Sequence, residues 1–232
     1  MKETEILGVF IGKTKDIGAG LASAIDKRRV AQRLWLWRQG MGGDEQGDRR
    51  FHGGPERALH HYPAEHYAYW RARYPHLDWQ APNFGENLSS RGLTEEQVCI
   101  GDLFRWGDAL LQVSQPRSPC YRLARRWGLG ELPQLLQDTG RCGWFYRIRK
   151  PGFVCAESRF ERIHCSHPEL SVAQALRDFF HSPQERAGLQ RLADCPALSP
   201  RWREHAARRL ASNQLEDWSA RLGGPPAQGL NS

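Results

Sequence analysis

Cys120 ends a short loop whose residue types suit a sulfur atom that must stay in one place. Pro116 and Pro119 restrict φ on either side of Arg117 and Ser118, so little of the loop remains to be ordered. A neighbouring guanidinium such as that of Arg117 favours the reactive thiolate form. The pattern predicts a cysteine that acts as a metal ligand or a nucleophile. The alternative is a buried cysteine that packs as a small hydrophobic residue.

Residues 40–55 contain six glycines, too many for a regular helix or strand. Bare backbone at Gly53 and Gly54 would let an anion approach the peptide N–H groups, and His52 and Arg57 could add side-chain donors. A tight turn between two strands explains the Gly-Gly pair equally well. The segment is therefore a candidate anion site with a structural alternative.

Two further segments carry candidate polar groups. Residues 61–66 have the form His-x-x-x-Glu-His, which is one residue longer than the inverted zincin motif, so we expect no zinc hydrolase site. Pro63 is expected at the first position of a helix, with His66 on the helix surface and His61 at the border of a pocket. In the loop at 84–88, Asn87 is a candidate ligand contact, although ordinary turn chemistry also explains it.

Taken together, four segments resemble the MOSC-domain proteins, specifically the bacterial YiiM-like group. In chain order they are Phe-His-Gly-Gly-Pro-Glu-Arg-Ala-Leu at 51–59, Phe-Gly-Glu-Asn-Leu at 84–88, Ile-Gly-Asp-Leu-Phe at 100–104 and Pro-Arg-Ser-Pro-Cys at 116–120. MOSC domains are β-barrels that bind a molybdenum pterin. The resemblance implies a mainly β chain, with a MOSC-type β-barrel and a small C-terminal three-helix domain.

The same resemblance implies a reductase of N-hydroxylated compounds, such as 6-hydroxylaminopurine and amidoximes, that detoxifies base analogues with the molybdenum cofactor (molybdopterin). Soft sulfur is the appropriate protein donor to molybdenum, so Cys120 would be the metal ligand. The implied catalytic residues are Cys120, Asn87 and His61, and the implied cofactor-binding residues are His52, Gly53, Gly54, Arg57, Arg117 and Asn87. A cofactor carrier or sulfur-handling module without turnover stays open as the alternative.

The composition and the absence of certain motifs limit the kinds of partner that we expect. The sequence has no Rossmann fingerprint, flavin motif or iron–sulfur ligand set, so electrons would come from a separate reductase. The net charge of +7 admits an acidic partner, but we expect the arginines of the C-terminal region to be a solvated face and not a nucleic-acid site. Without a secretion signal, a ~20-residue apolar span or a Cys-x-x-Cys pair, the expectation is a cytoplasmic protein with reduced thiols and no membrane contact. A homodimer stays open.

Apolar runs separated by turn signals predict several short strands and a closed or nearly closed barrel. Strands are expected at 5–11, 33–38, on either side of the turn at 107–108, at 144–148 and 153–156 as a hairpin, and at 159–164, with a helix near 132–138. The predicted domains are 1–165 for the barrel, 166–222 for the helices and 223–232 for a disordered tail. Capping signals at Ser171, Ser182 and Ser199 predict the starts of the three helices.

Overall fold

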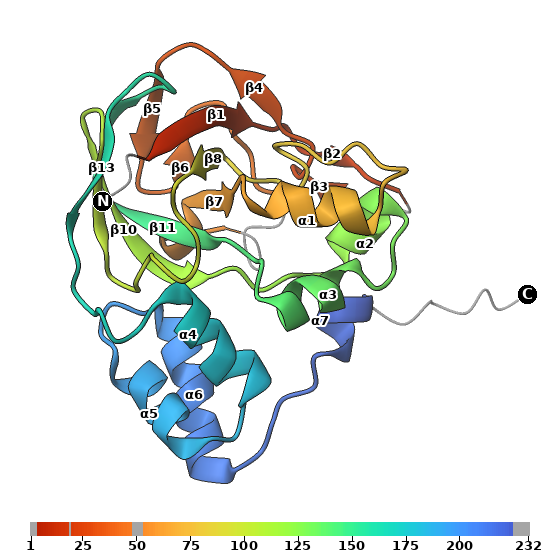
Figure 1. Ribbon diagram of the computed structural model, residues 1–232, viewed down its shortest axis with the longest axis vertical. Coiled ribbons are helices and arrows are strands. Elements are labelled where there is room, and N and C mark those ends of the chain that lie inside the picture. Colours follow the sequence, from red (N-terminus) through yellow and green to blue (C-terminus); the bar gives the residue numbers. More distant parts are fainter. Residues whose placement is uncertain (1–3, 19, 48–52, 225–232) are drawn as a thin grey trace, which may run out of the picture.

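The computed structural model describes residues 4–18, 20–47 and 53–224. A mixed sheet curls into a half-barrel, with some helices beside it and others below it in the view of Figure 1. The strands are β1 Glu5–Ile11, β2 Lys15–Asp16, β3 Ala22–Ser23, β4 Arg28–Val30, β5 Leu34–Trp37, β6 Gly40–Met41, β7 Leu59–Pro63, β8 Leu88–Arg91, β9 Leu103–Trp106, β10 Ala109–Pro116, β11 Trp144–Lys150, β12 Gly152–Val154 and β13 Phe160–His164. The helices are η1 Pro55–Arg57, α1 His66–Arg73, α2 Arg122–Trp127, α3 Leu132–Thr139, α4 Val172–Leu176, η2 Arg177–His181, α5 Arg186–Asp194, α6 Pro200–Ser212 and α7 Ser219–Gly223.

The main sheet has the order β13-β9-β10-β11-β7-β8-β1-β4. Its neighbours are antiparallel except β7 and β8, which run parallel because the chain crosses over through α1 between them. Along β11 the side chains of Trp144, Tyr146 and Ile148 point inward at alternate positions and are buried. The MOSC-type barrel with a C-terminal helical unit is confirmed, in the form of a half-barrel whose edge strands β4 and β13 lie at opposite ends of the sheet.

The predicted strands at 5–11, 33–38, 159–164 and around the turn at 107–108 are confirmed, as is the helix near 132–138. The position of Pro63 was predicted wrongly. It ends the fully buried strand β7, where it lies opposite Ser90 of β8, and α1 begins three residues later at His66. Burial of five consecutive side chains outweighs the preference of proline for a helix start.

The predicted hairpin between residues 144–148 and 153–156 is also wrong. Strand β11 pairs with β10 and β7, whereas β12 pairs with β5 in a separate three-stranded sheet. At Gly152 the chain leaves one sheet for the other, and it passes so close to β10 that a Cβ there would lie 2.5 Å from the Asp108 carbonyl carbon. The Pro-Gly pair therefore marks a change of sheet.

The C-terminal helices pack around Phe179, Phe180 and Trp202, with the Phe179 and Trp202 rings 4.2 Å apart. Ser171 caps α4 as predicted, because its Oγ accepts from the Gln174 N–H at 3.0 Å. The predicted cap at Ser182 is wrong: Ser182 closes the preceding turn of π-helix, and the carboxylate of Glu185 caps α5 instead.

Helix α7 leaves the helical unit and returns to the barrel beside α3 (Figure 1). The predicted tail begins at residue 223, but residues 225–232 lie outside the described residues. Within the described ranges, no helix combines the length and the apolar character that crossing a membrane requires.

Candidate functional site

A cavity of about 120 Å³ opens among the loops at one end of the half-barrel. The segments 22–27, 44–47 and 84–87 form its walls together with the start of β7 and the Cys120 loop. Its polar lining residues are Ser23, Lys27, Asp44, Glu45, Gln46, Arg57, His60, Asn87, Arg117, Cys120 and Arg122. The structure thus brings together four predicted site residues from three distant segments, namely Arg57, Asn87 and the pair Arg117 and Cys120.

The Cys120 loop is held from two sides. Where β10 ends, the Arg117 N–H donates to the Gly143 carbonyl at 3.0 Å, which ties the loop to the segment before β11. On the other side, Arg221 of α7 donates to the Pro119 carbonyl at 2.6 Å, and its own carbonyl accepts from the Tyr121 N–H at 2.9 Å. These bonds fix the residues before and after Cys120, whose side chain is partly exposed in the cavity.

Two arginines give the cavity positive charge at its buried end. Burial lowers the pKa of Arg57 to about 10, with a further contribution from Arg201 and an opposing one from Cys120, so Arg57 stays protonated at neutral pH. Arg117 is 8% exposed, and within the described part of the chain its Nη1 is buried without a hydrogen-bond partner. A buried guanidinium N–H without an acceptor is costly, and a guanidinium is the side chain that suits an anionic ligand best.

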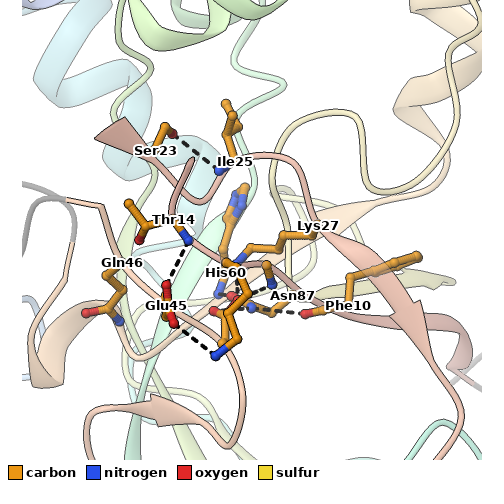
Figure 2. A network of polar contacts seen from close by, with 12 residues as sticks. Phe10, Thr14, Ser23, Ile25, Lys27, Glu45, Gln46, His60 and Asn87 are labelled. Carbon is orange, nitrogen blue, oxygen red and sulfur yellow. Dashed lines mark hydrogen bonds and ion pairs between the residues drawn. The ribbon is translucent and has the colours of Figure 1, made fainter. Parts of the chain in front are cut away.

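Asn87 joins three walls of the cavity (Figure 2). Its Nδ2 donates to the Phe10 carbonyl at 3.1 Å and to Asp44 Oδ2 at 2.8 Å, and its Oδ1 accepts from the His60 N–H at 3.1 Å. Both amide donors are thus used within the protein, and one lone pair of Oδ1 remains for any other contact. The geometry makes Asn87 a positioning residue for the walls, and its predicted contact to cofactor or substrate stays a prediction.

Sequence reasoning missed the ion pair between Lys27 and Asp44. Lys27 Nζ lies 2.5 Å from Asp44 Oδ1, and both side chains are only 7% exposed. The same oxygen accepts from the Gly12 N–H at 2.7 Å. Asp44 stood in the glycine-rich segment, but no local signal linked it to Lys27, which lies in the stretch of short strands between β1 and β5.

The histidine that lines the cavity is His60 and not the predicted His61. The His61 side chain is fully buried between Tyr146 and Ser90, with its Nδ1 3.0 Å from the Tyr146 hydroxyl and its Nε2 2.8 Å from Ser90 Oγ. Burial lowers the pKa of His61 to about 3. Burial, and then the charge of Arg117, holds the pKa of His60 well below its usual value, so this lining imidazole is neutral at pH 7.

The glycine pair does not line the cavity. Gly54 has φ of +90°, which favours glycine, and its carbonyl accepts from the Arg57 N–H at 3.0 Å in the turn that begins η1. A Cβ on Gly53 would lie 2.1 Å from the side-chain oxygen of Gln46, a lining residue. Both glycines therefore shape the approach to Arg57, and the predicted anion contact at their N–H groups stays a prediction. The predicted donor His52 lies outside the described residues.

Glu86 is a buried acid that precedes Asn87 in the sequence, and it does not line the cavity. Its Oε1 accepts from the Tyr67 hydroxyl, and its Oε2 accepts from the Phe84 N–H at 3.1 Å. Burial raises the pKa of Glu86 to about 7, although these bonds act in the opposite direction.

Comparison with known proteins agrees with this architecture. The MOSC domain family matches residues 48–161, and the family described as "YiiM-like, 3-alpha helix domain" matches residues 170–213. Protein YiiM of Escherichia coli (strain K12) is 43% identical over 218 residues, which cover 93% of this chain and 97% of that protein. The chain belongs to the YiiM-like MOSC proteins.

The crystal structure of YiiM from Escherichia coli superposes on this MOSC protein with a TM-score of 0.83 at 38% identity, covering 97% of this chain and 100% of that chain. A protein named "Reductase" from Gibberella moniliformis (strain M3125 / FGSC 7600) is 34% identical over 198 residues. The match covers 83% of this chain and 35% of the fungal protein. The YiiM-like arrangement of barrel and helices thus accounts for nearly the whole chain.

The cavity has the chemistry that a molybdenum cofactor requires, which the MOSC family implies. A pterin phosphate needs guanidinium and N–H donors, and Arg117 Nη1 is a buried donor that no described group satisfies. Molybdenum needs a soft donor, and Cys120 is the cysteine that lines the described cavity. Arg57 adds positive charge beside both.

Proposed function

We propose that this chain is a molybdenum cofactor-dependent reductase of N-hydroxylated compounds, such as 6-hydroxylaminopurine and amidoximes. One observation carries the proposal: a partly exposed thiol, Cys120, shares a cavity with Arg117, whose buried Nη1 lacks an acceptor among the described residues. A soft metal donor and a guanidinium that suits an anion therefore belong to the lining of one cavity. The fungal relative named "Reductase" supports the reaction class.

In the proposed reaction, two electrons and two protons convert the N-hydroxyl compound into the amine and one molecule of water. The bound cofactor supplies the two-electron chemistry. Cys120 would hold the metal, and Arg57 and Arg117 would bind the anionic part of the cofactor. The neutral His60 adds no charge to this end of the cavity. Electrons would come from a separate reductase that docks at the open side of the cavity.

Asp44 and Asn87 have a different part in the proposal. Asp44 neutralises Lys27 and accepts from Asn87, and Asn87 in turn links β1 to β7. The two residues connect the walls of the cavity through hydrogen bonds that are satisfied within the protein. A preformed pocket of this kind limits the ordering cost when a rigid cofactor binds.

The test is the molybdenum and oxidised-pterin content of the protein purified from a cofactor-producing host, followed by reductant-dependent conversion of 6-hydroxylaminopurine. Cys120→Ala should lose molybdenum and turnover. Cys155→Ala is the matched control, because Cys155 is also partly buried but does not line the cavity. Cys142 is a poorer control, since its side chain is 0% exposed and its Sγ lies 3.2 Å from the Leu136 carbonyl.

Three outcomes distinguish the reductase from the cofactor carrier or sulfur-handling module. Bound cofactor with turnover in wild type and in Cys155→Ala would support the reductase. Bound cofactor without turnover, in the presence of an artificial electron donor, would favour a cofactor carrier or sulfur-handling module. Absence of both molybdenum and pterin, from a host that loads other molybdenum enzymes, would refute both functions.

A further inference from the structure

Two cysteines and one aspartate lie close together where the chain passes from the barrel to the helical unit. Cys99 and Asp102 stand in the turn before β9, and Cys165 follows the last strand, β13. The two sulfurs and a carboxylate oxygen all lie within 4.8 Å of one another. Two sulfurs bound to one tetrahedral zinc at about 2.3 Å lie roughly 3.8 Å apart, so small side-chain movements would bring these atoms to bonding distance.

Hydrogen bonds orient the Asp102 carboxylate through one of its two oxygens. Its Oδ2 accepts from the Cys99 N–H at 3.0 Å and from Arg162 Nη1 at 3.0 Å. Its Oδ1 is buried and has no hydrogen-bond partner in the described part of the chain, on a side chain that is 0% exposed. A buried carboxylate oxygen without a partner is destabilising, and a bound cation would relieve that cost.

The charges balance around a divalent ion. Two thiolates and one carboxylate carry three negative charges, a zinc ion carries two positive charges, and the guanidinium of Arg162 on Asp102 supplies the third. Arg162 also donates to the Gln97 carbonyl at 2.6 Å, which fixes it in place. A hydrogen bond to the second oxygen of a ligating carboxylate is a common device for orienting metal ligands.

The three residues of the cluster differ in their exposure to solvent. Cys165 is exposed and Cys99 is 7% exposed, so an ion can enter beside Cys165 and keep a water as its fourth ligand. The linker after Cys165 packs closely on the same turn, where Ser166 Oγ donates to the Gly101 carbonyl at 3.1 Å. Thiolate sulfur selects zinc over magnesium or calcium.

We propose that Cys99, Asp102 and Cys165 form a zinc site that fastens the linker of the helical unit to the barrel. The site is separate from the Cys120 cavity, and it does not depend on the proposed reductase function. Zinc bound there would join the turn before β9 to the residue that follows β13, and so restrain the junction of the two parts of the chain.

The test uses the full-length protein, treated with a chelator, reduced with a phosphine and titrated with Zn²⁺ and with Co²⁺. The Cys120→Ala background removes the cavity thiol from the signal. We expect one zinc per chain, a thiolate-to-cobalt charge-transfer absorption and a higher Tm with zinc. Cys165→Ser should weaken zinc binding ~100-fold or more, since loss of a residue that only hydrogen-bonds to a metal ligand already lowers metal affinity ~10- to 100-fold.

Cys155→Ser serves as the matched control and should bind zinc as wild type does, because Cys155 lies outside the cluster. Cys165 is exposed, so its serine variant is expected to fold and the test does not depend on a fragile variant. No stoichiometric zinc in the reduced protein, or equal affinity in Cys165→Ser, would overturn the proposal. A Cys99–Cys165 disulfide that forms in air, with no zinc uptake after reduction, would also overturn it and leave a redox dithiol.

Discussion

Cys120 and the pair Cys99 and Cys165 lie in different electrostatic surroundings. The cavity of Cys120 holds Arg57, Arg117 and Arg122 beside the Lys27–Asp44 ion pair and Glu45, so basic residues outnumber acidic ones, whereas the pair lies beside Asp102, whose partner is Arg162. Burial, and then the charge of Asp102, raises the pKa of Cys99 to about 12, and burial also raises the pKa of Cys165. The contrast teaches that the charge of the neighbours suits one thiol to an anionic cofactor and the other two to a cation.

The carboxylates Asp44 and Asp102 differ in how deeply their basic partners are buried. This difference predicts the largest effect on the free energy of unfolding. Asp44→Asn should lower the free energy of unfolding by about 3–5 kcal/mol, because it leaves Lys27 buried and unpaired. Asp102→Asn, measured without zinc, should cost about 1–2 kcal/mol, since Arg162 is 24% exposed and can reach water. Urea unfolding of both variants at neutral pH checks the comparison. Equal losses of unfolding free energy in the two variants would contradict the prediction that the more buried basic partner makes the larger difference.

Glu86 makes the stability of the cavity wall depend on pH. Its folded-state pKa of about 7 exceeds the usual value of 4.5, so the folded protein binds the proton more tightly than the unfolded chain does. The stabilisation is therefore complete below about pH 4.5 and is lost as the pH rises through 7, by about 3 kcal/mol in all.

In the Glu86→Gln variant this loss should be absent. The unfolding free energy of wild type relative to the variant should fall by about 3 kcal/mol between pH 4.5 and pH 8. His60 and His61 titrate in both proteins, so their contributions cancel in the difference. A difference that stays constant over this range, measured by urea unfolding, would contradict the assignment of the raised pKa to Glu86.

The orphan donor of Arg117 predicts a loss of cofactor binding. Arg117→Gln should weaken pterin retention about 10- to 100-fold, because a charge-assisted hydrogen bond contributes about 1.5–3 kcal/mol. The matched control is Arg125→Gln, an exposed arginine of α2 that does not line the cavity. Pterin content after extended dialysis measures the effect. The same loss in both variants would point to net charge and not to the Arg117 contact.

Loss of the hydrogen bonds made by Arg221 of α7 gives the smallest predicted effect. Arg221→Met removes two hydrogen bonds, to the Pro119 carbonyl and to Gln137 Oε1, and should reduce turnover about tenfold by loosening the Cys120 loop. Arg208→Met, at an exposed position of α6, should leave turnover unchanged. Because the zinc site lies elsewhere, Arg221→Met should also leave zinc affinity unchanged. A change in zinc affinity would show that the two thiol sites are coupled.

Much of the fold was predictable from local patterns. The strand at 5–11, the turn at 107–108 and the cap at Ser171 each depend on residues close together in the sequence, and all three are confirmed. The errors at Pro63 and at residues 152–154 occurred where burial or pairing with a distant strand decided the outcome. Pro63 became a strand end because β7 is buried along its whole length, and residues 152–154 joined another sheet because β5 offered a partner.

The sequence by itself determined the family, the barrel with its helices and the segment that carries Cys120, because these depend on residue types and short spacings. Only the tertiary structure decided that His60 and not His61 lines the cavity, that Lys27 pairs with Asp44, and that Cys165 meets Cys99. It also brought Arg221 to Pro119, a contact across 102 residues of chain. Such contacts depend on how distant elements pack, and no local pattern records that packing.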